Sequence, residues 1–242
     1  MRLTTGGEDE AFWNYRDLAL FLGLAAPCLL GGALLTKVTL LALFVSTAHK
    51  ALELLPGQFI GYALLYAALA FIFRFEYERP FWRSLGWRWP EFRLPSIIGL
   101  GCLLAFSIAM LGALLKTPEV PAPMRELFND RSSLLAVAFA GVTVGPLCEE
   151  LAFRGFMQPL FIRSLGVVPG IFLAALGFGL LHLPQYGYDW QHGVLITMAG
   201  VGFGWMRWIS GSTLGSTIMH AAYNLTLFLG FYAGGSKVPQ SW

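Results

Sequence analysis

The chain has few charged residues. Asp, Glu, Lys and Arg make up 12% of its 242 residues, about half the share that is usual in a soluble globular chain. Together with 56% hydrophobic residues in long uncharged runs, this excludes an ordinary soluble domain and indicates a membrane-embedded protein. The net charge of +2 comes without a basic stripe or a glycine-rich phosphate loop, so we expect no nucleic-acid partner.

Cysteine is also scarce, and the amino-terminal residues lack the pattern of a signal peptide. Cys28, Cys102 and Cys148 all fall in apolar stretches, and an odd number at such places argues against a disulfide framework. The first residues are acidic and show no basic start before a short apolar core, so we expect the first span to be retained. Trp13 and Tyr15 are typical of an anchor at the membrane interface.

Apolar stretches of suitable length predict an all-α, polytopic transmembrane helix bundle with seven or eight spans. The seven predicted spans are 18–35, 57–73, 95–115, 132–160, 167–183, 193–206 and 211–233. The mixed segment 36–55 is predicted to be interfacial or re-entrant, with an eighth span as the alternative. We divide the chain into an N-terminal membrane segment, 1–94, with a basic loop at 74–94, and a membrane core, 95–242.

The distribution of Lys and Arg predicts the orientation of the bundle. With the N-terminus in the cytoplasm, nine of these residues fall on the cytoplasmic side and six on the other. The positive-inside rule favours this arrangement. We therefore expect a multi-pass protein of the cell membrane with a cytoplasmic N-terminus.

Two adjacent carboxylates, Glu149 and Glu150, and the guanidinium of Arg154 lie within the predicted span 132–160. A charged side chain at the centre of a membrane helix costs about 2.5–3.5 kcal/mol, so the three groups are expected to be functional. Glu150 and Arg154 are four residues apart and can pair along one helix face. Glu149 points about 100° away and is left free to face other helices.

Histidines on two further spans complete the set of polar groups. His182 shares a helix face with Phe178, and His220 shares one with Asn224, whereas His49 and His192 are expected in loops. A carboxylate, two imidazoles and an amide, without a partnered Ser or Cys nucleophile, suit the attack of water on a carbonyl group. Glu149 can act as general base, His182 can orient the water, and His220 and Asn224 can donate to the developing oxyanion.

Two other interpretations use the same residues. Glu149, His182 and His220 are a possible catalytic zinc set, although the chain lacks an HExxH helix. Intramembrane carboxylates and histidines also build proton relays, so a non-enzymatic scaffold, immunity or transport protein is the second alternative. The chain shows none of the inverted repeats that many transporters carry.

Three motifs in a fixed order carry a family resemblance. They are Glu149-Glu150-x-x-x-Arg154, Phe178-x-x-x-His182 and His220-x-x-x-Asn224. In these motifs, and over about residues 95–232, the chain resembles the CPBP (CAAX protease and bacteriocin-processing, Abi-like) intramembrane glutamic proteases. This family includes the type II CAAX prenyl endopeptidases, and also members proposed to act in bacteriocin immunity or as scaffolds.

The resemblance implies an intramembrane endopeptidase that cleaves a membrane-associated or lipidated peptide or protein in the lipid bilayer and needs no metal or other cofactor. It implies that Glu149, His182, His220 and Asn224 are catalytic. Glu150, Arg154 and Phe178 are implied as supporting residues.

Helix geometry raises one difficulty for this site. Glu149 lies near the middle of its predicted span, whereas His182 and His220 lie nearer the ends of theirs, so straight helices would not bring the three together. We therefore expect tilted helices, or kinks near Pro159, Pro169 and Pro184. Gly200-x-x-x-Gly204 and Gly211-x-x-x-Gly215 are predicted to allow close helix packing.

Overall fold

The computed structural model describes residues 11–43, 50–118 and 131–233, and these residues form helices and no strand. Five of the helical segments are long and apolar enough to cross a membrane: Tyr15–Ala42, Leu54–Phe75, Leu94–Leu114, Arg131–Leu165 and Val167–Tyr186. Two more helices of 21 residues each, α10 (Trp190–Ser210) and α11 (Thr213–Ala233), coincide with the last two predicted spans. The predicted all-α, multi-pass membrane bundle is confirmed.

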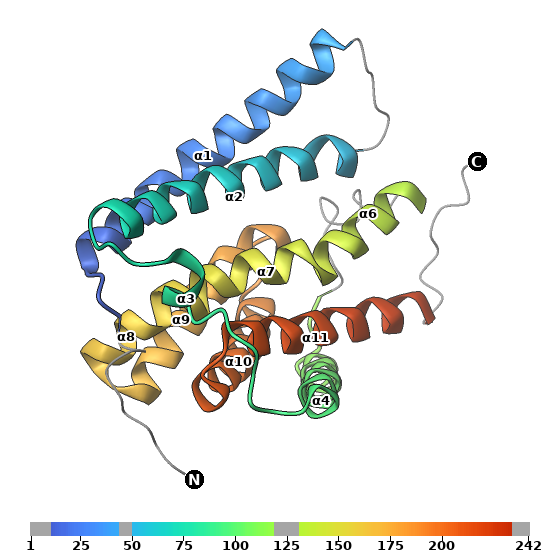
Figure 1. The fold of residues 1–242 in the computed structure, drawn as a ribbon. Coiled ribbons are helices and arrows are strands. Elements are labelled where there is room, and N and C mark those ends of the chain that lie inside the picture. The colour runs from blue at the N-terminus through green and yellow to red at the C-terminus, as the bar shows by residue number, and fades with distance from the viewer. Residues whose placement is uncertain (1–10, 44–49, 119–130, 234–242) are drawn as a thin grey trace.

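The first two helices, α1 (Tyr15–Ala42) and α2 (Lys50–Phe75), form an antiparallel hairpin at one side of the molecule (Figure 1). Glycine allows them to approach closely, because a Cβ on Gly61 would lie 2.7 Å from the Cα of Leu29. The prediction of a separate interfacial or re-entrant segment at 36–55 is wrong, since α1 continues through Ala42 and α2 begins at Lys50. Residues 44–49, which include His49, lie outside the described part.

Trp13 is not an interfacial anchor. Its side chain is 1% exposed and packs in the aromatic core, whereas Tyr15 is 49% exposed. Asn14 caps α1 through a capping box with Asp17, which fixes the direction in which the chain enters the helix. The residues just before α1 are therefore an internal part of the bundle.

A loop with the short helix α3 (Phe81–Ser84) joins the hairpin to α4 (Leu94–Leu114). This loop, part of the predicted basic stretch 74–94, is hydrogen-bonded to the turn between α10 and α11. The Thr213 amide donates to the Gly86 carbonyl at 2.9 Å, and Nε of Arg88 donates to the Gly211 carbonyl at 2.8 Å. These bonds tie the N-terminal segment to the last two helices.

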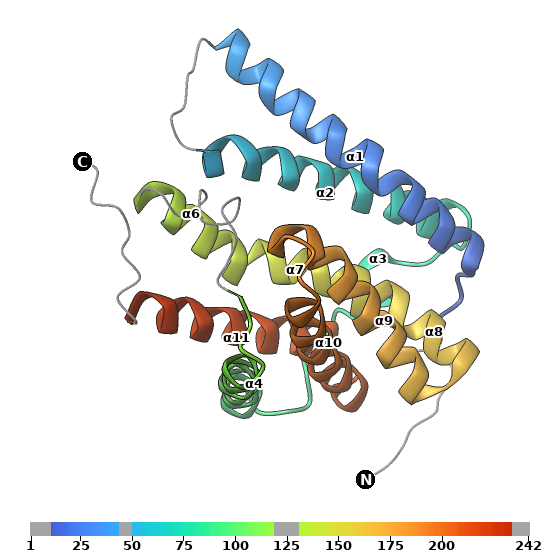
Figure 2. The ribbon, with the colours of Figure 1, turned by 180° about the vertical axis from the view of Figure 1, so that it is seen from behind.

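The predicted span 132–160 is a long, interrupted helical run. It consists of α6 (Arg131–Val142), α7 (Val144–Glu150), the π-helix η1 (Leu151–Met157) and α8 (Gln158–Leu165). The interruption between α6 and α7 is at Thr143, whose φ of −120° and ψ of −81° are not helical. Figures 1 and 2 show this run crossing the molecule between the α1–α2 hairpin and α11.

The chain then reverses at Gly166, whose φ of +88° is a conformation that favours glycine. It continues through α9 (Val167–His182), the short 3₁₀ helix η2 (Leu183–Tyr186), α10 and α11. Helix α9 packs between α8 and α10, and α11 contacts α4, α6, α7 and α10 (Figure 2). The three predicted polar motifs thus come from neighbouring elements.

Candidate active site

The buried ion pair of Glu150 and Arg154 lies at the centre of the site. Both side chains are 0% exposed, and Nη1 of Arg154 lies 3.0 Å from Oε1 of Glu150. The same carboxylate oxygen lies 3.0 Å from Nδ1 of His220. A carboxylate oxygen can only accept, so Nδ1 of His220 donates a hydrogen bond to it, whereas Arg154 forms a close ion pair with it. Glu150 therefore links the helix that carries it to α11.

Arg154 is also held by α10 and by aromatic rings. Its Nη2 donates to the Gly200 carbonyl at 2.9 Å. Its guanidinium carbon lies 4.6 Å from the ring centre of Phe178 and 5.5 Å from that of Phe203. Such cation–π contacts stabilise a cation that is removed from water.

Glu149 faces a different set of partners. Its Oε1 lies 3.9 Å from Nε2 of His182, and its Oε2 lies 3.7 Å from Nε2 of His220. The side chain is 23% exposed, whereas that of Glu150 is fully buried. Both distances exceed those of direct hydrogen bonds, so this carboxylate lies between two imidazoles and is bonded directly to neither.

The two histidines are oriented by their other ring nitrogens. Nδ1 of His182 lies 2.7 Å from the Phe178 carbonyl, which can only accept, so in this contact Nδ1 carries the proton. His220 is held in the same way through Nδ1 by Glu150. In each neutral ring this leaves Nε2, the nitrogen nearer Glu149, as an acceptor.

Asn224 lies one turn beyond His220 on α11 and uses its amide elsewhere. Its Nδ2 donates to the carbonyl of Gly141 at 2.6 Å, near the end of α6. The structure therefore places Glu149, Glu150, Arg154, His182 and His220 together, with Asn224 beside them. A side-chain amide has a second N–H, which this hydrogen bond does not use.

The sequence placed Glu149, His182 and His220 at different depths along their spans. In the structure, helix ends and interruptions bring the three side chains together. His182 is the last residue of α9, and His220 lies in the second turn of α11. The run that carries Glu149 is interrupted at Thr143 and continues as a π-helix after Glu150. Because of these features, the three side chains meet without straight, parallel helices.

Several residues at the site belong to none of the three motifs. The Tyr66 hydroxyl, on α2, donates to the carbonyl of Cys148, the residue before Glu149. The Phe203 ring stacks on His220 with centres 4.2 Å apart. Neither carries a signal in the sequence, because aromatic residues are common throughout the apolar spans.

His192, which was expected in a loop, lies in the first turn of α10. Asp189 caps this helix and accepts hydrogen bonds from the His192 backbone at 3.0 Å and from its Nδ1 at 2.7 Å. The backbone N–H of His192 lowers the pKa of the Asp189 carboxyl. This pair serves as a helix cap.

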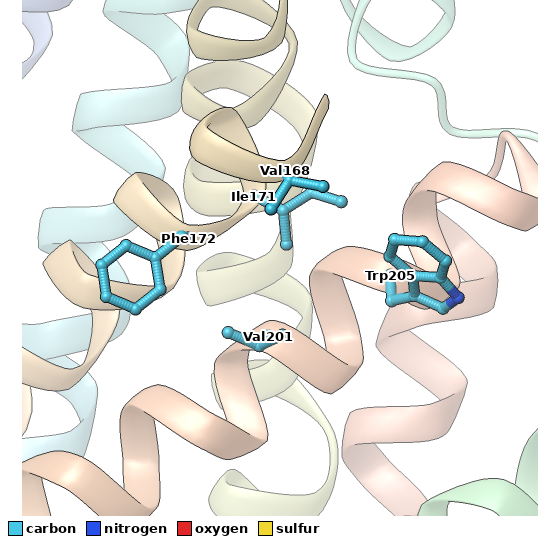
Figure 3. Close-up of a pocket in the computed structure, with 5 residues that line it drawn as sticks. All are labelled: Val168, Ile171, Phe172, Val201 and Trp205. Carbon is cyan, nitrogen blue, oxygen red and sulfur yellow. The ribbon is translucent and has the colours of Figure 1, made fainter. Parts of the chain in front are cut away.

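A separate apolar hollow lies between α9 and α10 (Figure 3). Its lining residues are Val168, Ile171, Phe172, Val201 and Trp205. Val168 precedes His182 by fourteen residues on α9, which corresponds to about 21 Å along the helix. The hollow is therefore not part of the Glu149 site.

Fold and site together define a multi-pass membrane protein with a buried carboxylate–imidazole centre. Among the described residues, no group of three His, Cys, Asp or Glu side chains is arranged to hold a metal ion.

Residues 131–226 match the family model described as type II CAAX prenyl endopeptidase, Rce1-like. The family resemblance carried by the three motifs is confirmed over this region, which is similar to a domain of a membrane protease family. The matched region contains all seven predicted site residues, and it is shorter than the expected 95–232. No curated protein and no solved structure matches the chain.

Proposed function

We propose that the protein is an intramembrane endopeptidase that hydrolyses a peptide bond with a water molecule activated by Glu149 and His182. The observation that carries this proposal is the different pairing of two adjacent carboxylates. Glu150 is neutralised by Arg154, whereas Glu149 lies within 4 Å of two imidazoles and, among the described residues, forms no ion pair with a Lys or Arg. A partly accessible carboxylate of this kind can accept a proton from water.

In the first step, the Glu149 carboxylate takes a proton from the water molecule. At the same time, the oxygen of the water attacks the scissile carbonyl carbon. Nε2 of His182, as an acceptor, holds the second O–H of the water and so orients the attacking lone pair. The new C–O bond forms as the carbonyl π electrons move onto oxygen, which becomes an oxyanion. Positioned acid–base groups of this type contribute about 10²–10⁴-fold to a rate.

His220 is suited to stabilise the oxyanion when it is protonated. Its Nδ1–H is already directed at Glu150, and this hydrogen bond fixes the orientation of the ring. Nε2–H would then donate to the oxyanion, together with the second N–H of Asn224. One such donor contributes about 10²–10³-fold to kcat.

In the second step, the tetrahedral intermediate collapses and the C–N bond breaks. The leaving amine takes the proton held by Glu149, so the products are a carboxylic acid and an amine, and the site returns to its starting state. No cofactor takes part. Arg154 stays bound to Glu150 throughout and keeps that carboxylate charged behind His220.

The substrate class follows from the surroundings of the site and from the family. The site lies in a bundle whose outer surface carries exposed Leu30, Leu114 and Phe106, as expected for contact with lipid tails. We propose a membrane-associated peptide or protein that carries a lipid near the scissile bond, as the family description suggests. The proposed location is the cell membrane.

The decisive experiment compares membranes that contain the wild-type protein, Glu149→Gln or the control Glu91→Gln, which changes an exposed loop carboxylate. Quantitative proteomics should show peptides cleaved in the wild type and in Glu91→Gln, with cleavage reduced at least about 100-fold in Glu149→Gln. Unchanged cellular function in a folded Glu149→Gln protein would contradict the protease and favour a scaffold, immunity or transport role.

A further inference from the structure

The π-helix η1 determines where Arg154 lies relative to Glu150. It begins directly after Glu150, and all seven of its residues, Leu151–Met157, are buried. π-helical turns are rare and are found frequently at functional sites. Whatever keeps η1 in place therefore also keeps the Glu150–Arg154 pair in place.

The end of η1 is short of helical hydrogen-bond donors. The Gln158 amide donates five residues back, to the Phe153 carbonyl, and the next residue, Pro159, has no N–H. Trp13 adds a bond from outside the helix to a neighbouring carbonyl of the same turn, because its Nε1 donates to the Phe156 carbonyl at 3.1 Å. The contact is buried and joins residues 143 positions apart.

Trp13 is fixed in this position by its neighbours. Its ring stacks on Phe156 with centres 5.4 Å apart and lies 5.2 Å from the ring of Phe73 on α2. The side chain of Arg163, on α8, donates to the carbonyl of Ala11. The residues before α1 are thus attached to both η1 and α8.

A second set of contacts ties η1 and α8 to α10. Arg154 and Gln158, four residues apart, donate to the carbonyls of Gly200 and Gly204 at 2.9 and 3.0 Å. A Cβ on Gly204 would lie 2.7 Å from Oε1 of Gln158, and one on Gly200 would lie 3.1 Å from Nη2 of Arg154. The Gly200-x-x-x-Gly204 motif therefore makes room for two polar side chains.

We propose that Trp13 and Gln158 are positioning residues, which hold η1 so that Arg154 keeps Glu150 and His220 in register behind Glu149. Neither side chain is in contact with Glu149 in this arrangement, and each acts through the backbone that carries or faces Arg154. The inference rests on the proposed function and extends it to Trp13, which lies outside the region matched by the family model.

The test uses two variants that remove a donor and keep the packing. Trp13→Phe retains an aromatic ring against Phe156, and Gln158→Met retains side-chain length. Trp89→Phe is the matched control, because Trp89 is 67% exposed and lies in the loop before α4. The purified full-length proteins are compared on a synthetic peptide with an S-farnesyl cysteine, alongside hydrogen exchange of residues 151–161.

We expect kcat to fall about tenfold in each variant, with KM changed less than about twofold, because misplaced groups slow the chemical step more than they weaken binding. Amide exchange should accelerate in residues 151–161 and stay unchanged in α4. Trp89→Phe should match the wild type. If Trp13→Phe does not fold, Gln158→Met provides the same test.

Three outcomes would overturn the inference, and the first two are unchanged exchange in residues 151–161 and a normal kcat despite faster exchange there. A general loss of protection in every helix would also contradict it, since that indicates a merely structural role. If neither the wild type nor Glu149→Gln cleaves any substrate, the proposed function fails. Exchange then still decides whether Trp13 and Gln158 hold η1.

Discussion

At the scale of single residues, the site depends on one oxygen atom. Oε1 of Glu150 accepts a hydrogen bond from Nδ1 of His220 at 3.0 Å and forms an ion pair with Nη1 of Arg154, also at 3.0 Å. Both the cation and the imidazole are therefore held by a carboxylate that is not proposed to react. This explains why the chain tolerates two adjacent carboxylates in an apolar helix: each has a different environment and a different role.

Removal of Arg154 should destabilise the protein strongly. In Arg154→Met the Glu150 carboxylate would remain buried without its cation, and breaking a buried pair in this way costs about 3–5 kcal/mol. Thermal unfolding in detergent measures the loss. The double variant Glu150→Gln/Arg154→Met removes the uncompensated charge and should recover part of the stability; a double variant less stable than Arg154→Met would contradict this explanation.

Metal removal separates the proposed mechanism from the zinc alternative. Because water is activated by Glu149 and His182 without a metal in the proposed mechanism, we expect cleavage of the farnesylated peptide to be unchanged by 1,10-phenanthroline. Elemental analysis of the purified protein accompanies the assay, and a known zinc protease serves as the positive control. Stoichiometric zinc together with loss of activity on chelation would show that Glu149, His182 and His220 bind a metal instead.

At the scale of helices, the ends and interruptions position the site. His182 can reach Glu149 because α9 ends there, and Glu149 precedes the change from α-helix to π-helix. The cap of α10 also helps to position the site. It fixes the start of the helix whose carbonyl groups accept hydrogen bonds from Arg154 and Gln158.

The cap of α10 gives a pH-dependent prediction. The pKa of Asp189 is lowered in the folded protein, chiefly by the His192 backbone N–H. Its charge therefore stabilises the fold above the unfolded-state pKa of about 3.9, and this stabilisation is lost as the pH falls through the lower, folded-state pKa. Asp189→Asn keeps a capping side chain without the charge.

Thermal unfolding of the wild type and Asp189→Asn between pH 7 and pH 3 tests this. The wild type should be the more stable protein at pH 7, and the difference should shrink below about pH 4. A difference that is constant over the whole range would show that the Asp189 charge does not contribute.

At the scale of the whole molecule, the membrane bundle consists of an N-terminal hairpin and a set of helices around the site. The two are connected by the aromatic core around Trp13 and by hydrogen bonds from the α3 loop to the turn between α10 and α11. This connection determines how the bundle is placed in the membrane as a unit.

The distribution of Lys and Arg predicts that the N-terminus is cytoplasmic. With seven spans, a reporter fused after Trp242 should be active only outside the cytoplasm. Paired reporters, one active on each side of the membrane, measure this, with fusions in the basic loop 74–94 as the cytoplasmic reference. A cytoplasmic signal at Trp242 would contradict this orientation with seven spans.

Contacts within one helix could be predicted from the sequence, whereas contacts between helices could not be predicted from spacing alone. The pairing of Glu150 with Arg154, and the separate direction of Glu149, follow from residue spacing within one helix. The meeting of Glu149 with His182 and His220 could be inferred only from the motifs, because spacing does not reveal contacts between helices. The π-helix and the hydrogen bond from Trp13 to Phe156 have no sequence signal, since they depend on tertiary packing.

The contact between Trp13 and Phe156 also affects the order in which the protein folds during synthesis. Protein synthesis adds about 5–20 residues per second, and 143 residues separate the two partners, so Trp13 exists for about 7–30 s before Phe156 is made. During that interval the indole N–H has no partner at this site, although α2 can already contact α1, α3 and α6. The first residues of the bundle to be synthesised are therefore among the last to reach their final contacts.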